Sequence, residues 1–306
     1  MKAVRVNGWG QPVQLEDVPQ PKNAGDEVLV RVHAASINPF DAFVQAGYMQ
    51  GMVSSPLTLG TDFSGEVVEA GSEVKNLKTG DSVYGLVPMH SGSFAEYLVA
   101  KGNEVTCKPE TLSFVEAAGV PLASLAAYQS LFDLGQAKKG ERVLVIGAAG
   151  AVGGCAIQLA KELGAYTYGV DVPERAGFVH DLGVDRFIDT KAERFEDVVG
   201  TVDLVLDYVG GDNLQRSYSV LKPGGRYVTS LILTPAQVEE TERRGFSAKG
   251  LGTQARVDHL DDLGRRIDSG KLKIFINRTF PLNEVQAALD FRLKTTNPGK
   301  IVLTMM

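Results

Sequence analysis

A glycine-rich segment in the middle of the chain carries the strongest chemical signal. A buried β-branched run is followed by glycines at every third position, in the order VLVIGAAGAVG from Val143 to Gly153. Gly147 permits a tight turn, Gly150 lets a bound group approach the backbone, and Gly153 lets a helix pack against the strand. Free amides at the helix start would then bind a diphosphate. The alternative interpretation is a packing turn without a ligand.

The residues after the next predicted strand bear on the choice of dinucleotide. Asp171 follows the glycines by about twenty residues, where a carboxylate can bind the adenosine ribose and repel a 2′-phosphate. Arg175 has the opposite effect because a guanidinium can pair with that phosphate. The alternative roles are a helix cap for Asp171 and a solvated surface cation for Arg175. We therefore expect NAD(P)H as the cofactor, with a preference for NAD.

Two later segments, Asp207–Gly211 and Thr229–Leu231, are expected to end strands at the carboxyl edge of the same sheet. Their small side chains and backbone could flank the nicotinamide ring, although ordinary connections between strand and helix would read the same way. The cofactor-binding residues predicted from these patterns are Gly147, Ala149, Gly150, Ala151, Val152, Gly153, Asp171, Arg175, Val209, Gly210, Ser230 and Leu231.

Composition excludes several classes of partner. A net charge of −6 without basic clusters of the nucleic-acid-binding kind gives no reason to expect nucleic acid or an anionic membrane. The uncharged run Val143–Ala160 changes from strand to helix pattern, so it predicts a buried βα unit and not a membrane span. Two distant cysteines, Cys107 and Cys155, and no signal-peptide pattern at the start favour the cytoplasm.

The elements that position these residues follow from periodicity. Short strands bounded by turn residues fill the first third, at Val4–Val6, Glu27–Val32, Gly65–Ala70 and Ser82–Leu86. Strands and helices then alternate, which predicts an α/β fold with a doubly wound parallel sheet. The strands are expected at Arg142–Gly147, Tyr166–Val170, Asp203–Asp207 and Arg226–Leu231, and the helices at Val152–Leu163, Pro173–Leu182 and Asp212–Leu221.

The end of the chain reads as a strand at Ile274–Phe280, a helix at Leu282–Phe291 and a closing strand at Gly299–Leu303. Periodicity leaves open whether these elements rejoin the first domain.

Several sequence blocks resemble the medium-chain dehydrogenase/reductase superfamily, in its zinc-independent quinone oxidoreductase and enone reductase branch. The blocks are INPFD at 37–41, GTDFSGEV at 60–67, GDSVYG at 80–85, GSFAEY at 92–97, the glycine turn, and GKIVL at 299–303. The resemblance implies a Rossmann NAD(P)-binding domain (121–264) inserted into a GroES-like β-rich catalytic domain (1–120, with 265–306 returning to it). It also implies an active site in the cleft between the domains and a homodimer joined through the dinucleotide sheets.

The same resemblance argues against a metal. Zinc-binding relatives carry a cysteine in the block at 37–41 and a His-Glu pair after the glycine at 60, where this chain has Asn38 and Thr61-Asp62. Two distant cysteines cannot form a four-cysteine structural site, and the four histidines show no paired spacing. We therefore expect no metal, which disfavours alcohol dehydrogenation because that reaction needs a metal to polarise the alkoxide.

Without a metal, the expected reaction is hydride transfer to a quinone or an α,β-unsaturated carbonyl compound, whose conjugated oxygen spreads the charge. By resemblance, Asn38 and Asp41 line the cleft and Tyr48 is the candidate proton donor. Tyr48 directly follows Gly47, where relatives usually have one more residue between them, so water is the alternative donor. Asn38 and Asp41 could instead form an Asx-turn scaffold, and Tyr48 could be a lining aromatic.

Ser124 stands where relatives usually have a threonine whose hydroxyl approaches the nicotinamide carboxamide, and a helix-packing role is the alternative. Two other functions remain as hypotheses. Enoyl-thioester reduction would need a basic entrance, for which Arg243-Arg244 and Lys249 are the nearest cluster. A dinucleotide-binding sensor without turnover is the non-enzymatic reading.

Overall fold

The computed structural model describes residues 1–295 and 297–305, which separate into two units. The first unit contains residues 1–122, 255–270 and those described from 274 onward, and the second contains Ala123–Gln254 and Lys271–Lys273. The sequence prediction assigned 255–264 to the inserted domain. In the structure this stretch begins α9 (Val257–Asp268) and packs within the first unit, where Tyr84 Oη donates to the Leu260 carbonyl at 2.7 Å.

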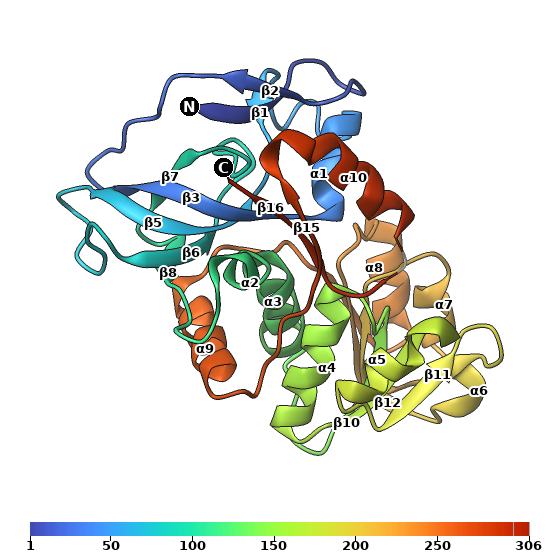
Figure 1. Ribbon diagram of the computed structural model, residues 1–306. Coiled ribbons are helices and arrows are strands. Elements are labelled where there is room, and N and C mark those ends of the chain that lie inside the picture. The colour runs from blue at the N-terminus through green and yellow to red at the C-terminus, as the bar shows by residue number, and fades with distance from the viewer. Residues whose placement is uncertain (296, 306) are drawn as a thin grey trace. The chain divides into compact units, whose positions relative to one another are not determined.

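The first unit is built on β3, which pairs with β5, β7 and β16 (Figure 1). The strand β16 runs antiparallel to β3, so the C-terminal segment completes the sheet that the N-terminal segment begins. The larger sheet has the order β15-β16-β3-β5-β6-β8, and a smaller one has the order β2-β1-β4. The strands are β1 (Lys2–Val6), β2 (Gln14–Asp17), β3 (Glu27–Ile37), β4 (Leu57–Thr58), β5 (Asp62–Ala70), β6 (Ser82–Leu86), β7 (Tyr97–Lys101), β8 (Val105–Cys107), β15 (Ile276–Pro281) and β16 (Lys300–Thr304).

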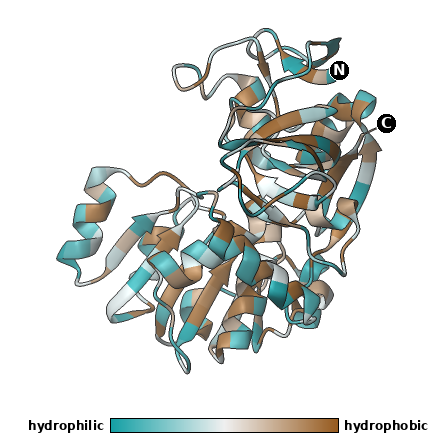
Figure 2. Cartoon of the chain, turned by 90° about the vertical axis from the view of Figure 1, so that its left-hand side faces the viewer, coloured by the Kyte–Doolittle hydropathy of each residue, from teal (hydrophilic) through white to brown (hydrophobic). Residues whose placement is uncertain are grey.

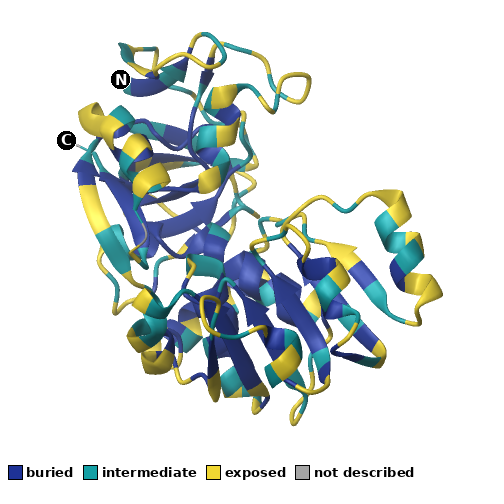
Figure 3. Cartoon of the chain, turned by 90° about the vertical axis from the view of Figure 1, so that its right-hand side faces the viewer, coloured by how far each residue is buried: buried dark blue, intermediate teal, exposed yellow. Residues whose placement is uncertain are grey.

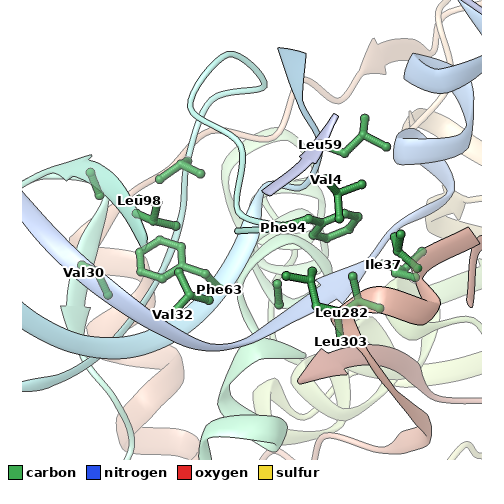
Figure 4. Close-up of a cluster of buried hydrophobic side chains, with 14 of the residues drawn as sticks. Val4, Val30, Val32, Ile37, Leu59, Phe63, Phe94, Leu98, Leu282 and Leu303 are labelled. Atoms are coloured by element: carbon green, nitrogen blue, oxygen red, sulfur yellow. The ribbon is translucent and has the colours of Figure 1, made fainter. Parts of the chain in front are cut away.

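Both ends of the chain contribute to one hydrophobic core in this unit. Val4 from the first strand lies in the same cluster as Leu282 and Leu303, around the buried rings of Phe63 and Phe94 (Figure 4). Burial of these side chains drives the association because apolar surface leaves water. The helices of the unit are α1 (Pro39–Ala46), α2 (Phe114–Ala118), α9, and α10 (Val285–Lys294), which follows a 3₁₀ turn at Leu282–Glu284.

The second unit is a six-stranded parallel sheet in the order β11-β10-β9-β12-β13-β14, which confirms the doubly wound prediction. The strand order reverses at β9, so a crevice is expected at its carboxyl end. Its strands are β9 (Arg142–Ile146), β10 (Tyr166–Asp171), β11 (Arg186–Asp189), β12 (Val202–Asp207), β13 (Leu221–Thr229) and β14 (Ser247–Gly250). Its helices are α4 (Ala151–Leu163), α5 (Ala176–Asp181), α6 (Phe195–Val198), α7 (Asn213–Ser217) and α8 (Pro235–Arg243), while α3 (Pro121–Tyr128) and a π-helical turn (Gln129–Leu134) lead into the unit.

Hydrophobic residues are concentrated in the strands (Figure 2), and the central strands of the parallel sheet are buried (Figure 3). Among the predicted helices of the second unit, two differ from the structure. The helix predicted at Asp212–Leu221 is the short α7, because Leu221 already begins β13, and the one predicted at Pro173–Leu182 is a 3₁₀ turn followed by α5. None of the helices in the described residues has the length and apolar character needed to span a bilayer.

Candidate functional site

The glycine turn joins β9 to α4 in the second unit. Gly147 has a φ of 86°, a left-handed conformation that favours glycine. A Cβ atom at Gly153 would lie 2.1 Å from the Gly147 carbonyl oxygen, so only glycine lets the first turn of α4 lie this close to the strand end. The turn is fixed to the sheet because the amides of Gly147 and Ala148 both donate to the Val170 carbonyl, at 3.0 and 3.1 Å.

Three backbone donors at the start of α4 stay open. Gly150 is the N-cap, and the first amide that bonds within the helix belongs to Gly154, which donates to the Gly150 carbonyl at 2.8 Å. No described residue accepts a hydrogen bond from the amides of Ala151, Val152 or Gly153. Such amides, together with the positive end of the helix dipole, form an anion-binding site.

Asp171 ends β10 directly beside this turn. Its Oδ2 accepts the Ala149 amide at 2.8 Å, and its Oδ1 accepts the Val172 amide at 2.8 Å and Arg175 Nη1 at 3.1 Å. The carboxylate is 7% exposed. The structure therefore brings Ala149, Asp171 and Arg175 together, but the Ala149 amide is already bonded within the unit and is not an open donor.

Asp207 organises the turn at the end of β12. Its fully buried carboxylate accepts the amides of Val209 and Gly210, at 2.9 and 3.0 Å, and the Tyr227 hydroxyl at 2.5 Å. Burial, the negative charge of Asp207 and the hydrogen bond to it raise the pKa of Tyr227, which therefore stays a neutral donor. These bonds hold the exposed Val209 beside the glycine turn, since a Cβ atom at Gly147 would lie 2.9 Å from Val209 Cγ2.

The end of β13 completes this group. The Ser230 amide donates to the Asp207 carbonyl at 3.3 Å, and Leu231 Cδ1 lies 2.0 Å from where a Cβ atom of Gly210 would stand. Leu231 is 44% exposed, so its side chain lines the surface of the unit. The structure thus brings Val209, Gly210, Ser230 and Leu231 to the carboxyl edge of the sheet near the glycine turn. Ser124 lies in α3 and is fully buried.

The first unit holds a buried polar cluster around Asp62. Its Oδ2 accepts Ser36 Oγ at 2.5 Å, Asn38 Nδ2 at 3.0 Å and Lys300 Nζ at 3.2 Å, and its Oδ1 accepts the Leu122 amide at 2.8 Å. Lys300 Nζ also donates to Asn38 Oδ1 at 2.5 Å. Asn38 is 4% exposed, and both ends of its carboxamide are occupied within the cluster.

Asp41 lies next to this cluster on the first turn of α1. Its Oδ2 accepts the Asn38 amide at 2.7 Å, which caps the helix that Pro39 begins. Burial, with a smaller contribution from the negative charge of Asp62, outweighs the lowering effects of the Asn38 and Gly60 amides and of Lys300, so that the pKa of Asp41 is raised to about 7. Asp41 is therefore a buried acid that can change charge near neutral pH.

Tyr48 follows the left-handed C-cap of α1 at Gly47 and is 76% exposed. Its ring packs edge-to-face on Phe43, with 5.8 Å between ring centroids, and its amide donates to the Phe43 carbonyl. The Tyr48 side chain thus extends from the C-terminal end of α1, and Asn38 and Asp41 lie at the N-terminal end of the same helix. The three catalytic candidates belong to the first unit, and the cofactor candidates to the second.

Sequence reasoning missed Lys300, Asp62 and Ser36 as parts of the polar cluster. Lys300 and Asp62 lie in two of the blocks that carried the family resemblance, and each stands among hydrophobic residues of a strand. A charged residue in an apolar strand predicts a buried partner, because an isolated charge is rarely buried. That signal marks the residues but cannot name their partners.

No group of three His, Cys, Asp or Glu residues within 1–295 and 297–305 is arranged to hold a metal ion. The oxygens of Asn38 and Asp62 already face the ammonium of Lys300, so a divalent cation there would meet a fixed positive charge. The donor set therefore does not fit a zinc ion.

Comparisons with known proteins match both units. A family model described as alcohol dehydrogenase GroES-like domain matches residues 24–128, and one described as zinc-binding dehydrogenase matches residues 182–303. The human protein described as NAD(P)H oxidoreductase RTN4IP1, mitochondrial, is 33% identical over 92% of this chain and 82% of its own length. The 2-methylene-furan-3-one reductase of Solanum lycopersicum is 34% identical over 99% of this chain and 79% of its own length.

The solved structure of the quinone oxidoreductase from Coxiella burnetii has a TM-score of 0.92 and 34% identity, and covers 100% of this chain and 99% of its own. The two family models, the identity along nearly the full length and the shared fold agree with each other. The chain belongs to the medium-chain dehydrogenase/reductase superfamily, in its branch of quinone oxidoreductases and enone reductases.

Proposed function

We propose that this protein transfers a hydride from NAD(P)H to a quinone or an α,β-unsaturated carbonyl compound. The observation that carries the proposal is the row of open amides at Ala151–Gly153 beside the apolar side chains of Val209 and Leu231. The amides suit a diphosphate and the apolar side chains suit a nicotinamide ring. A reduced nicotinamide bound there would supply the hydride. The names of the similar proteins support the same reaction.

The reaction we propose is independent of zinc. The ammonium of Lys300 pairs with Asp62 and donates to Asn38 Oδ1, so no other cation is needed to balance Asp62. Quinones and enones accept a hydride without a strong Lewis acid because conjugation spreads the developing charge.

The residues of the first unit divide into two roles. Addition of hydride to a conjugated acceptor leaves an enolate or a quinol anion, which takes up a proton. We assign the exposed Tyr48 hydroxyl as the donor, with water as the alternative. Asn38 and Asp41 are buried. The Asp41 carboxylate accepts the Asn38 amide, and the Asn38 side chain donates to Asp62. They act as positioning residues that fix the turn from β3 into α1, the helix that ends at Tyr48.

We propose a preference for NAD over NADP. Asp171 stands where an acid can bind a ribose diol, and it already pairs with Arg175. A 2′-phosphate would have to draw Arg175 away from this carboxylate and would meet the negative charge of Asp171. The ion pair therefore works against NADP, although Arg175 alone would favour it.

Enoyl-thioester reduction finds less support. The basic cluster considered for its phosphate is partly compensated, because Arg243 and Arg244 both pair with the one carboxylate of Glu240, at 2.5 and 2.7 Å. This contact lowers the net positive charge of the cluster, which favours quinones and enones as substrates.

We also propose a homodimer and a reducing, cytoplasmic environment. The strand β14 is at an edge of the parallel sheet, where its outer side can pair with the same strand of a second copy. Cys107 and Cys155 do not form a disulfide bond. Light scattering across a concentration series tests the dimer, and a monomer at every concentration would contradict it.

The test of function is oxidation of NADH and of NADPH with panels of quinones, alkenals and enoyl-thioesters. We expect turnover with quinones or alkenals, and deuterium from 4-deuterated NADH at the β-carbon of the reduced alkenal. Tight NADH binding without turnover on any acceptor would instead identify a dinucleotide sensor and overturn the proposal.

A further inference from the structure

A cavity of about 440 Å³ lies in the first unit, along the segment that follows Tyr48. One wall is formed by the chain from 51 to 58, and the other by the side chains of Arg5 from β1 and His90 from the turn after β6. Met52 and Ser54 stand at the exposed side. Polar groups make up most of the surface of this cavity.

Arg5 is the charged group of the cavity. Its Nη1 donates to Thr58 Oγ1 at 2.9 Å and its Nη2 donates to the Pro56 carbonyl at 3.1 Å. Both acceptors are neutral, and a guanidinium has five N–H donors. Within the described part of the chain, no carboxylate pairs with Arg5. The side chain is therefore held in place, retains unused donors, and keeps its charge uncompensated.

The rest of the lining does not neutralise this charge. None of the residues around the cavity is Asp or Glu, although the whole chain carries 37 acidic and 31 basic residues. The other titratable side chain at the cavity, His90, carries a ring N–H that can donate a hydrogen bond to an anion. An acid-free pocket with a fixed guanidinium attracts anions.

The segment from 51 to 58 is tied to the rest of the unit. Ser55 Oγ donates to the Val6 carbonyl at 2.9 Å, and the Val53 amide donates to the Met49 carbonyl at 3.2 Å. Tyr48 lies three positions before Gly51, the first residue of this segment. A molecule bound in the cavity would therefore contact the segment that follows the proposed proton donor.

We propose that Arg5 and His90 bind a carboxylate or phosphate on the hydride acceptor, at a distance from its conjugated bond. Acidic conjugated acceptors are then preferred to neutral ones. The inference rests on the proposed reaction for the identity of the bound compound. The competing role for Arg5 is purely structural, as a clamp on Pro56 and Thr58. The two roles predict different results when Arg5 is replaced: the loss of activity depends on the charge of the acceptor if Arg5 binds it, and does not if Arg5 is only structural.

The experiment compares 4-phenylbut-3-en-2-one with its para-carboxylate and its para-phosphate, with kcat/KM measured for each. Because Arg5→Met removes a charged hydrogen bond to the anion, we expect it to lower kcat/KM by at least about tenfold for the acidic acceptors. The neutral acceptor should change by less than about twofold. An equal loss for all three would show a structural clamp and overturn the proposal. A loss confined to one of the two acids identifies which anion the site takes.

Three further variants sharpen the result. Arg5→Lys keeps the charge and should retain part of the preference, and His90→Gln should lower it less than Arg5→Met. Lys22→Gln removes an exposed cation from the same unit and should leave the preference unchanged. A loss of preference as large as that of Arg5→Met in this control would show a general charge effect and contradict a specific site.

A binding measurement separates this inference from the proposed reaction. The saturated ketone 4-(3-oxobutyl)benzoate has no conjugated bond to reduce, and calorimetry can follow its binding without turnover. We expect binding to the wild type, competition by inorganic phosphate, and weaker binding to Arg5→Met. If no acceptor is reduced but this binding holds, the reaction is wrong and the anion site stands. Equal binding to both proteins overturns the site whatever the activity.

Discussion

The glycine turn of the second unit and the polar cluster of the first unit are both built from backbone and side-chain hydrogen bonds. They differ in whether all of their polar groups have a hydrogen-bond partner. In the cluster, Asp62 accepts from four donors and both ends of the Asn38 carboxamide are bonded. At the turn, the amides of Ala151–Gly153 have no acceptor in the described chain.

The difference separates a structural network from a binding site. Buried polar groups stabilise a fold only when their partners are complete, and a half-satisfied network is costly. At the turn, Ala151 and Val152 are only half-buried, so water or a ligand can reach this end of the helix. The cluster therefore fixes geometry, and the turn is left ready for an anion.

The largest effect is expected from removing Lys300. Lys300→Met leaves the Asp62 carboxylate buried without its cation, and breaking a buried pair typically costs about 3–5 kcal/mol. We expect the free energy of unfolding in a urea titration to fall by this amount. Arg31→Met, which breaks the exposed pair with Glu66, should cost less than about 1 kcal/mol.

The double variant Lys300→Met with Asp62→Asn tests the origin of this loss. It removes the buried negative charge together with its partner, so part of the lost stability should return. No recovery would mean that the packing of the lysine side chain, and not the ion pair, is what counts.

The glycine turn is expected to respond to Gly153→Ala through binding. The new methyl group would lie 2.1 Å from the Gly147 carbonyl, so the first turn of α4 has to move and the open amides move with it. We expect NADH affinity to fall at least about a hundredfold, or about 2.7 kcal/mol, by fluorescence titration. Gly154→Ala is the matched control, because the nearest atom to its methyl group would be Leu182 Cδ1, at 3.3 Å, and the nearest backbone atom would be 3.9 Å away. Equal affinities in both variants would contradict the cradle.

The turn could be predicted from the sequence because its physics is local. The glycine spacing, the β-branched run before it and the small residues after it lie in one continuous stretch, and β9 and α4 agree with the prediction within a residue at each end. The same holds for β10 and for β12, whose ends place Asp171 and Asp207.

The cluster could not be predicted because its members are distant in sequence. Lys300 and Asn38 are 262 positions apart, and only the pairing of β16 with β3 brings them together. Local patterns were also misleading at β13. Pro223, Gly224 and Gly225 are typical of a turn, yet the strand continues through them beside a register shift in β12.

Asp41 gives the first unit a pH dependence. Its pKa is raised from 3.8 to about 7 by burial, so the folded state holds a proton that the unfolded state releases. The associated stability is complete below about pH 4 and is lost as the pH rises through 7. Between pH 5 and 8 we expect a loss of roughly 2.6 kcal/mol, because nearly two pH units in this range lie below the folded pKa, at about 1.4 kcal/mol each. Urea titrations across this range should show a flatter profile for Asp41→Asn, and a profile as steep as that of the wild type would assign the dependence to another group.

The smallest effect is expected at the edge of the glycine turn. Asp171→Ser removes the carboxylate that would bind the ribose and frees Arg175 for a 2′-phosphate, so the ratio of kcat/KM for NADH over NADPH should fall about tenfold. Asp181→Ser on α5 is the control and should keep the ratio. Because Asp171 also holds the Ala149 amide, both cofactors can lose affinity together; the ratio isolates the ribose contact from that shared loss. A ratio equal to that of the wild type would show that Asp171 does not bind the ribose. Asp171 would then only stabilise the glycine turn through the Ala149 amide, a structural role like that of Asp62 in the first unit.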